Sequence, residues 1–419
     1  MRSLLEKVPE STATVELGLT ARMRMIGLSW TFGTSPEEGA NLCVEGEELA
    51  RRSGDLGSLA IFLTLHNSIR SATGGAFTRE AVANRLEAAA KAVRLADESD
   101  DPATRLGLRV TQIAAHYEAG RVREALTYDE QALRDPPADL MVGVDLVGVS
   151  PYIWFVMFRG ILLTTMGRLD EATRELDRAV ELARAHDDFE VLAQTHAFAC
   201  SLACLETDQH GALTHAHRAL EIAEKTGSAF SRVLAHHALG EARLLRGESS
   251  AAVDVLERAL AIGRDRQAGR QNEPLILPLL AEAHLAAGAP RAARETAERA
   301  LTLARERGMR MAECAAQLVV GRVLLRSEGV GAREAIDSAL AEASSLVGET
   351  GAKRYAPFIN LERAELARRV GADTARQREL SEAHRLFAEM GATARAERIA
   401  QELAATAGST SRIPSTNRS

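Results

Sequence analysis

The chain has 419 residues, of which 46% are apolar and 4% aromatic, and its formal net charge at pH 7 is −7. Basic and acidic residues are mixed along it, so no basic stripe indicates a nucleic-acid partner and no acidic block indicates a basic one. The four cysteines lack the spacing of a metal knuckle or a secretory disulfide framework, and no signal peptide precedes them, so we expect a cytoplasmic protein.

We expect no membrane span either. The most apolar run, 142–166, is interrupted by Asp145, Pro151 and Arg159. It therefore falls short of the roughly 20 uninterrupted apolar residues that a spanning helix needs.

Residues 1–12 have the pattern of the last turns of an amphipathic helix whose partner helix is missing. We interpret them as the remnant of a preceding repeat, as in a piece of a longer protein or a truncated descendant of one. Helical repeats are then predicted over 13–134. They pair as Ala13–Thr31 with Pro36–Ser53, Leu59–Ser71 with Thr78–Asp97, and Ala103–Ala119 with Val122–Arg134.

An apolar segment, 135–151, interrupts the repeats. Ala132 and Ala179 hold equivalent positions 47 residues apart, whereas the period elsewhere is near 40. Pro151 suits the first turn of the next helix. We consider two roles for this insertion: its apolar side chains, Leu140, Val144, Leu146 and Val149, pack over neighbouring helices, or the segment forms a lid over a binding site.

The repeats are most regular over 152–405. Tyr152–Gly167 and Gly167–Asp188 form a helical hairpin, and alanines dominate one narrow stripe of its second helix. We expect Ala179, Ala219, Ala259 and Ala300, which recur in this stripe, to be buried against neighbouring helices. A small residue also recurs in the middle of each first helix, at Gly160, Cys200, Gly240, Ala281, Gly321 and Ala364.

This periodicity predicts an all-α fold, an α-solenoid (superhelix) of about nine helix pairs with a period near 40 residues. A small residue in the first helix, a glycine turn and E-A…A-L in the second helix resemble tetratricopeptide repeats, although their usual period is about 34. The tail, 406–419, has no periodicity and is rich in Ser, Thr and Gly, so we expect it to be disordered.

Three segments carry a more specific resemblance: LVGVSPYIWFVMFRGILLTTMGRLDEA (146–172), AFSRVLAHHALGEARLL (229–245) and RELSEAHRLFAEMGATARAERIAQEL (378–403). They resemble the C-terminal repeat region of bacterial proteins that fuse a class III adenylate/guanylate cyclase domain to an ATPase domain, and that of large ATP-binding LuxR-type regulators. The resemblance implies a sensor that restrains the ATPase and output domains until a partner or ligand binds. This sequence contains neither the cyclase nor the ATPase, so the activity of that family is not assigned to it.

Catalytic motifs are absent from the sequence. No lysine follows a glycine, which excludes a P-loop, and neither G-x-S-x-G nor H-E-x-x-H occurs. We therefore expect no enzyme and no cofactor. The best metal candidate combines His196, Cys200 and Cys204 with His236 one repeat later, but Cys200 belongs to the small-residue row, so we interpret the cysteines as buried filler and expect no metal site.

Solenoids of this kind bind ligands on the concave wall formed by their first helices. The residues that we predict to line this groove flank the small-residue row: Trp154, Met157, Gln194, Ser201, His237, Glu241, Glu282 and Arg322. The wall would be apolar at one end and charged at the other, and the alternative is an ordinary solvated inner surface.

The leading hypothesis is a non-catalytic scaffold or sensor that binds a protein or peptide partner in bacterial signalling through a preformed concave surface. A second hypothesis is a receptor for a small-molecule effector, with the insertion closing over the ligand near Trp154. A third is that the chain is a remnant of a truncated cyclase-type protein. None of the three involves nucleic acid or a membrane.

Overall fold

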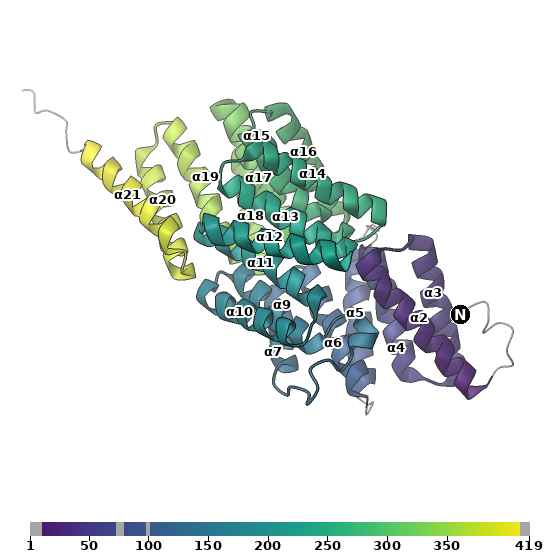
Figure 1. Cartoon of the computed structure of the whole chain (residues 1–419). Coiled ribbons are helices and arrows are strands. Elements are labelled where there is room, and N and C mark those ends of the chain that lie inside the picture. The colour runs from purple at the N-terminus through teal and green to yellow at the C-terminus, as the bar shows by residue number, and fades with distance from the viewer. Residues whose placement is uncertain (1–10, 73–78, 98–100, 411–419) are drawn as a thin grey trace, which may run out of the picture.

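The computed structural model describes residues 11–72, 79–97 and 101–410. Within these ranges the chain forms twenty α-helices and three short 3-10 helices, and no strand (Figure 1). The described helices include none long and apolar enough to cross a membrane.

Eighteen of the helices form nine consecutive antiparallel pairs, as predicted, and each pair packs on the next. The pairs in the N-terminal part are α2 (Thr12–Phe32) with α3 (Pro36–Ser53), α4 (Leu56–Ala72) with α5 (Arg79–Asp97), and α6 (Pro102–Glu118) with α7 (Val122–Ala132). The central pairs are α9 (Pro151–Met166) with α10 (Leu169–Ala185), α11 (Phe189–Glu206) with α12 (Gln209–Thr226), and α13 (Ala229–Leu245) with α14 (Ser249–Arg266). The C-terminal pairs are α15 (Glu273–Ala286) with α16 (Pro290–Glu306), α17 (Arg310–Ser327) with α18 (Arg333–Thr350), and α19 (Ala356–Arg369) with α20 (Asp373–Met390).

The remaining elements lie outside this pairing. They are α8 (Val144–Val147), the final helix α21 (Thr393–Thr410), and the 3-10 helices η1 (Arg270–Asn272), η2 (Gly329–Ala332) and η3 (Lys353–Tyr355). Helix α21 continues five residues beyond 405, so residues 406–410 of the tail, which were predicted to be disordered, are helical. Residues 411–419 of that tail and residues 1–10 of the predicted remnant helix lie outside the described residues.

The small-residue row marks the contact between the two helices of a pair. A Cβ atom on Gly160 would lie 2.7 Å from Leu176, and one on Gly240 would lie 2.5 Å from Leu256, so a side chain at either position would collide with the second helix. The alanines of the second helices, Ala179, Ala219, Ala259 and Ala300, are fully buried, which confirms the predicted stripe.

The insertion packs between distant repeats and is tied down at its end. Leu146 and Val147 of α8 lie over Gly107 of α6, and the Leu146 carbonyl lies beside Gly27 of α2. Ser150 Oγ donates to the Leu140 carbonyl at 2.5 Å and accepts from the Ile153 N–H at 3.2 Å, which caps α9. Leu140, Leu146 and Val149 of the insertion thus pack on hydrophobic clusters of neighbouring helices.

The C-terminal helices return to the middle of the chain. Arg395 of α21 donates to the carbonyl oxygens of Leu205 and Cys204, both at the end of α11. Met390, the last residue of α20, packs against the turn at Gly167, and one hydrophobic cluster contains residues of α9, α10, α20 and α21. The inner side of the solenoid is thereby bounded by helices far apart in sequence.

Candidate functional site: two adjoining cavities inside the solenoid

The inner side of the solenoid holds a cavity of about 870 Å³, which we call the inner cavity. The first helices of the successive pairs from α9 to α19 line it, together with the C-terminal end of α6, η3 and Arg395 of α21. Its walls include five of the eight predicted groove residues, namely Ser201, His237, Glu241, Glu282 and Arg322.

The other three predicted residues, Trp154, Met157 and Gln194, line a second cavity of about 200 Å³, the Trp154 cavity. The residues predicted to line a single groove therefore line two separate cavities. The cavities adjoin, because both are lined by the same five residues, Tyr117, Phe198, Leu234, Leu275 and Met311.

Trp154 belongs to the wall of its cavity and is not a free anchor in the groove. Its side chain is only 9% exposed and stacks on Phe158, with 4.2 Å between ring centroids and 16° between planes. Leu146, Val147 and Val149 of the insertion line the same cavity. The insertion thus both packs on neighbouring helices and closes one side of this apolar space.

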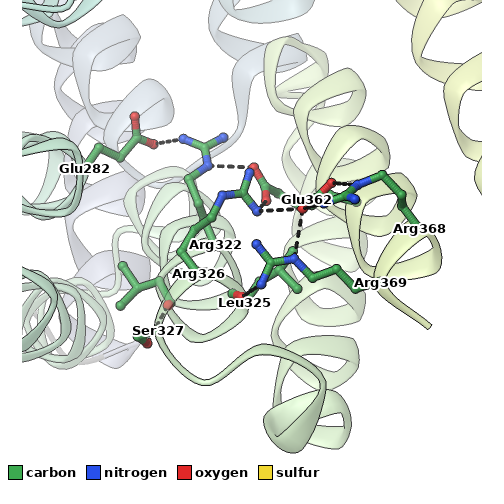
Figure 2. A network of polar contacts seen from close by, with 10 residues as sticks. Glu282, Arg322, Leu325, Arg326, Ser327, Glu362, Arg368 and Arg369 are labelled. Atoms are coloured by element: carbon green, nitrogen blue, oxygen red, sulfur yellow. Dashed lines mark hydrogen bonds and ion pairs between the residues drawn. The ribbon is translucent and has the colours of Figure 1, made fainter. Parts of the chain in front are cut away.

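A ladder of polar contacts in two sections links neighbouring first helices along the inner cavity, α11 with α13 and then α15 with α17 and α19. Ser201 Oγ donates to Glu241 Oε2 at 2.5 Å, one repeat further along the chain. Arg322 donates to Glu282 of the preceding repeat and, from Nε at 2.7 Å, to Glu362 of the following one (Figure 2). Residues one period apart lie side by side on adjacent helices, so the repeat itself builds this ladder.

Glu362 belongs to this ladder but is absent from the residues predicted to line the groove. It lies 40 residues after Arg322, which continues the row, whereas the small residue of that helix was aligned at Ala364, 43 residues after Gly321. Glu362 is buried, and Arg326 Nη1 also lies 3.4 Å from its Oε2. Its spacing of 40 residues from Arg322, which matches the repeat period, could have predicted its position.

Burial and mutual pairing set the charges of this ladder. Burial raises the pKa of Glu282, while Arg322 opposes that shift. Burial alone would lower the pKa of Arg322. The Glu282 and Glu362 carboxylates raise this pKa by more than burial lowers it, so the guanidinium stays charged. Burial also lowers the pKa of His237, which makes a neutral imidazole at pH 7.

The histidines and cysteines considered for zinc do not converge. His196 Nδ1 lies 3.0 Å from Nδ1 of His215 on α12, and Cys200 Sγ donates to the Ala238 carbonyl. Burial, with His215 and two arginines, lowers the pKa of His196 to about 4. In the ranges that the structure describes, no group of three or more His, Cys, Asp or Glu residues is arranged to hold a metal ion.

No protein family model matches the sequence, and no curated protein matches it. The structure is similar to the crystal structure of a Rap protein complexed with competence and sporulation factor, with a TM-score of 0.63 and 13% identity over 94% of this chain and 100% of that chain. Aspartyl phosphate phosphatase F from Bacillus subtilis aligns with a TM-score of 0.49 and 12% identity, over 90% of this chain and 95% of that one.

A signal-transduction ATPase with a tetratricopeptide repeat sensor from Pyrococcus horikoshii aligns with a TM-score of 0.45 and 11% identity, over 96% of this chain and 66% of that one. The likeness to the Rap protein concerns the fold. Together with the nine helix pairs, it makes the chain an all-α solenoid of tetratricopeptide-like repeats.

Proposed function

We propose that the chain is a non-catalytic sensor module that binds a short peptide in the inner cavity. The observation that carries this proposal is the cavity itself, whose volume of about 870 Å³ lies within the range of about 300–1,000 Å³ typical of ligand sites. Leu234, Leu279 and Leu318 supply apolar wall, and Glu241 and Arg322 supply charges whose positions are fixed by hydrogen bonds. Apolar walls with a few fixed polar groups give both affinity and orientation.

The repeat favours an extended chain molecule as the ligand. Equivalent positions on successive first helices present side chains at regular intervals along the cavity, and the backbone groups of a peptide also recur at regular intervals. A Rap protein of similar fold was crystallised with competence and sporulation factor, which supports a binding role for this arrangement of helices.

We further propose that this sensor acts in signalling. The three segments that resemble the repeat region of cyclase–ATPase proteins support a sensor whose occupancy is transmitted to a partner protein. The cavity is lined both by α11 and by Arg395, which joins α21 to α11. A peptide that contacts both elements would favour their closed arrangement, and a partner protein could respond to that change.

A small-molecule effector in the Trp154 cavity is the second candidate function. Three insertion residues line this cavity, and about 200 Å³ exceeds the roughly 150 Å³ of an engineered apolar cavity that binds benzene. A thermal-shift screen against small apolar metabolites, with wild type and Trp154→Ala, tests this candidate. A metabolite that stabilises both proteins equally would not be bound there.

Selection of peptides from a random library tests the main proposal. The purified chain should recover a limited set of sequences, and the Leu279→Trp variant should recover fewer, because the larger ring would project from the wall and obstruct part of the inner cavity. Leu303→Trp is the matched control, since Leu303 is also half-buried but lines neither cavity. Recovery of no sequence by wild type, or equal recovery by both variants, would refute the proposal.

A further inference from the structure

Cations outnumber carboxylates in the wall of the inner cavity. Four guanidiniums line it, those of Arg322, Arg326, Arg354 and Arg395, against the two carboxylates of Glu241 and Glu282. Glu362, which pairs with Arg322 and Arg326, adds a third carboxylate. Arg322 and Arg326 are thereby neutralised, and the excess positive charge falls on the other two arginines.

Arg395 has no carboxylate partner in the part of the chain that the structure describes. Its Nε donates to the Leu205 carbonyl at 2.6 Å and its Nη2 to the Cys204 carbonyl at 2.8 Å, while its guanidinium carbon lies 5.0 Å from the centroid of the Phe358 ring. Among the described residues, no carboxylate oxygen lies within 4.0 Å of it. Burial, and Arg398 nearby, lower its pKa to about 10, so Arg395 remains charged at neutral pH.

Arg354 is only weakly paired. Its Nη2 lies 3.8 Å from Glu241 Oε1, beyond hydrogen-bond distance, and the other oxygen of Glu241 accepts from Ser201. Arg354 and Arg395 both line the inner cavity, and the charge of Glu241 acts on both of them. One carboxylate therefore serves two half-buried guanidiniums.

We propose that Arg354 and Arg395 form an anion-binding end of the inner cavity and that the peptide ligand is acidic, with a carboxylate bound between them. A guanidinium removed from water is destabilising unless a negative charge or enough acceptors compensate for it, and a carboxylate is the group that it pairs with most strongly. Leu318 and Phe358, which line the same cavity, provide apolar surface for the neighbouring peptide residues. This inference rests on the proposed peptide-binding function.

The test uses a random dodecapeptide library displayed with free C-termini and the full chain. The recovered peptides should have net negative charge and share an Asp, a Glu or a required free C-terminus at one position. Two synthetic versions of a recovered peptide distinguish the sources of the carboxylate: amidation of the C-terminus, and replacement of the shared Asp or Glu by Asn or Gln. Only the version that removes the bound carboxylate should lose affinity.

Arg354→Gln should then weaken binding of the recovered peptide about ten-fold or more in fluorescence anisotropy, since a charge-assisted hydrogen bond is lost. Arg291→Gln is the charge-matched control, because Arg291 is 93% exposed on α16 and lies outside the cavity, and it should change affinity less than about two-fold. Thermal melting of both variants checks that they are folded. Arg395→Gln, measured in the same way, should also weaken binding.

Recovered peptides that are neutral or basic would overturn the anion-binding inference and leave the peptide-binding function standing. Equal affinities of Arg354→Gln and Arg291→Gln for the peptide would likewise overturn only the anion-binding inference. Failure of wild type to recover any peptide would instead refute the proposed function on which the inference rests.

Discussion

Arg395 Nη2 donates to the carbonyl oxygen of Cys204 at 2.8 Å although 191 residues separate them. This hydrogen bond joins the last described helix to α11. It turns the inner side of an open array of repeats into a cavity bounded on several sides, because Arg395 also lines that cavity.

Arg395→Met should therefore loosen α21. Two hydrogen bonds to buried carbonyls are lost, and we expect the free energy of unfolding to fall by about 1–3 kcal/mol. Hydrogen exchange of the α21 amides should accelerate. Arg398→Met on the exposed face of the same helix is the control, and an equal effect of the two changes would show that Arg395 does not hold the helix in place.

Two Gly→Ala changes, one inside the small-residue row and one outside it, should have opposite effects on stability. Gly240→Ala should destabilise the chain by about 1–3 kcal/mol, because the added Cβ would lie 2.5 Å from the Leu256 side chain. Gly348→Ala, in α18 with no neighbour within 4 Å, should be neutral or stabilise by up to about 1 kcal/mol through helix propensity. Chemical denaturation measures both, and a stabilising Gly240→Ala would contradict the close approach of the two helices.

Asp129 should make stability fall as pH rises. Its side chain is fully buried, neither carboxylate oxygen has a hydrogen-bond partner among the described residues, and burial raises its pKa well above the ordinary value. The folded state therefore holds a proton that the unfolded state releases near pH 3.9, so this group disfavours folding increasingly above that pH until its folded pKa is passed. Within this window the cost grows by about 1.4 kcal/mol per pH unit.

Asp129→Asn removes this titration. The difference in free energy of unfolding between the variant and wild type should shift in favour of the variant between pH 5 and pH 7, as measured by urea denaturation. Buried groups that do not interact with Asp129 titrate equally in both proteins, so their contributions cancel in this difference. Parallel stability curves over this range would show that Asp129 does not titrate as proposed.

Local sequence signals predicted the helices well. The range Pro36–Ser53 was predicted for α3 and is observed for it, because Ser35 caps its start, Pro36 occupies the first turn and Gly54 adopts a left-handed conformation after its end. The repeat offset also placed Ser201, Glu241, Glu282 and Arg322 on one wall, since it depends only on the regular stacking of neighbouring helices.

Long-range features were beyond the sequence pattern. The contact of Arg395 with Cys204 depends on small rotations that accumulate over several repeats, and no local spacing encodes their sum. Trp154 stacks on Phe158 in the wall of the second cavity, a side-chain arrangement that the repeat spacing does not specify. Glu362 was not predicted because its helix was aligned on Ala364, which lies 43 residues after Gly321 instead of about 40.

Hydrogen–deuterium exchange of the full chain, with and without a saturating recovered peptide, tests the central claim most directly. If the inner cavity is the binding site, the peptide should protect amides on the first helices α11, α13, α15 and α17, and leave the second helices α12 and α14, which do not line the cavity, unchanged. Protection concentrated on the second helices, with the first helices unchanged, would contradict binding in the inner cavity.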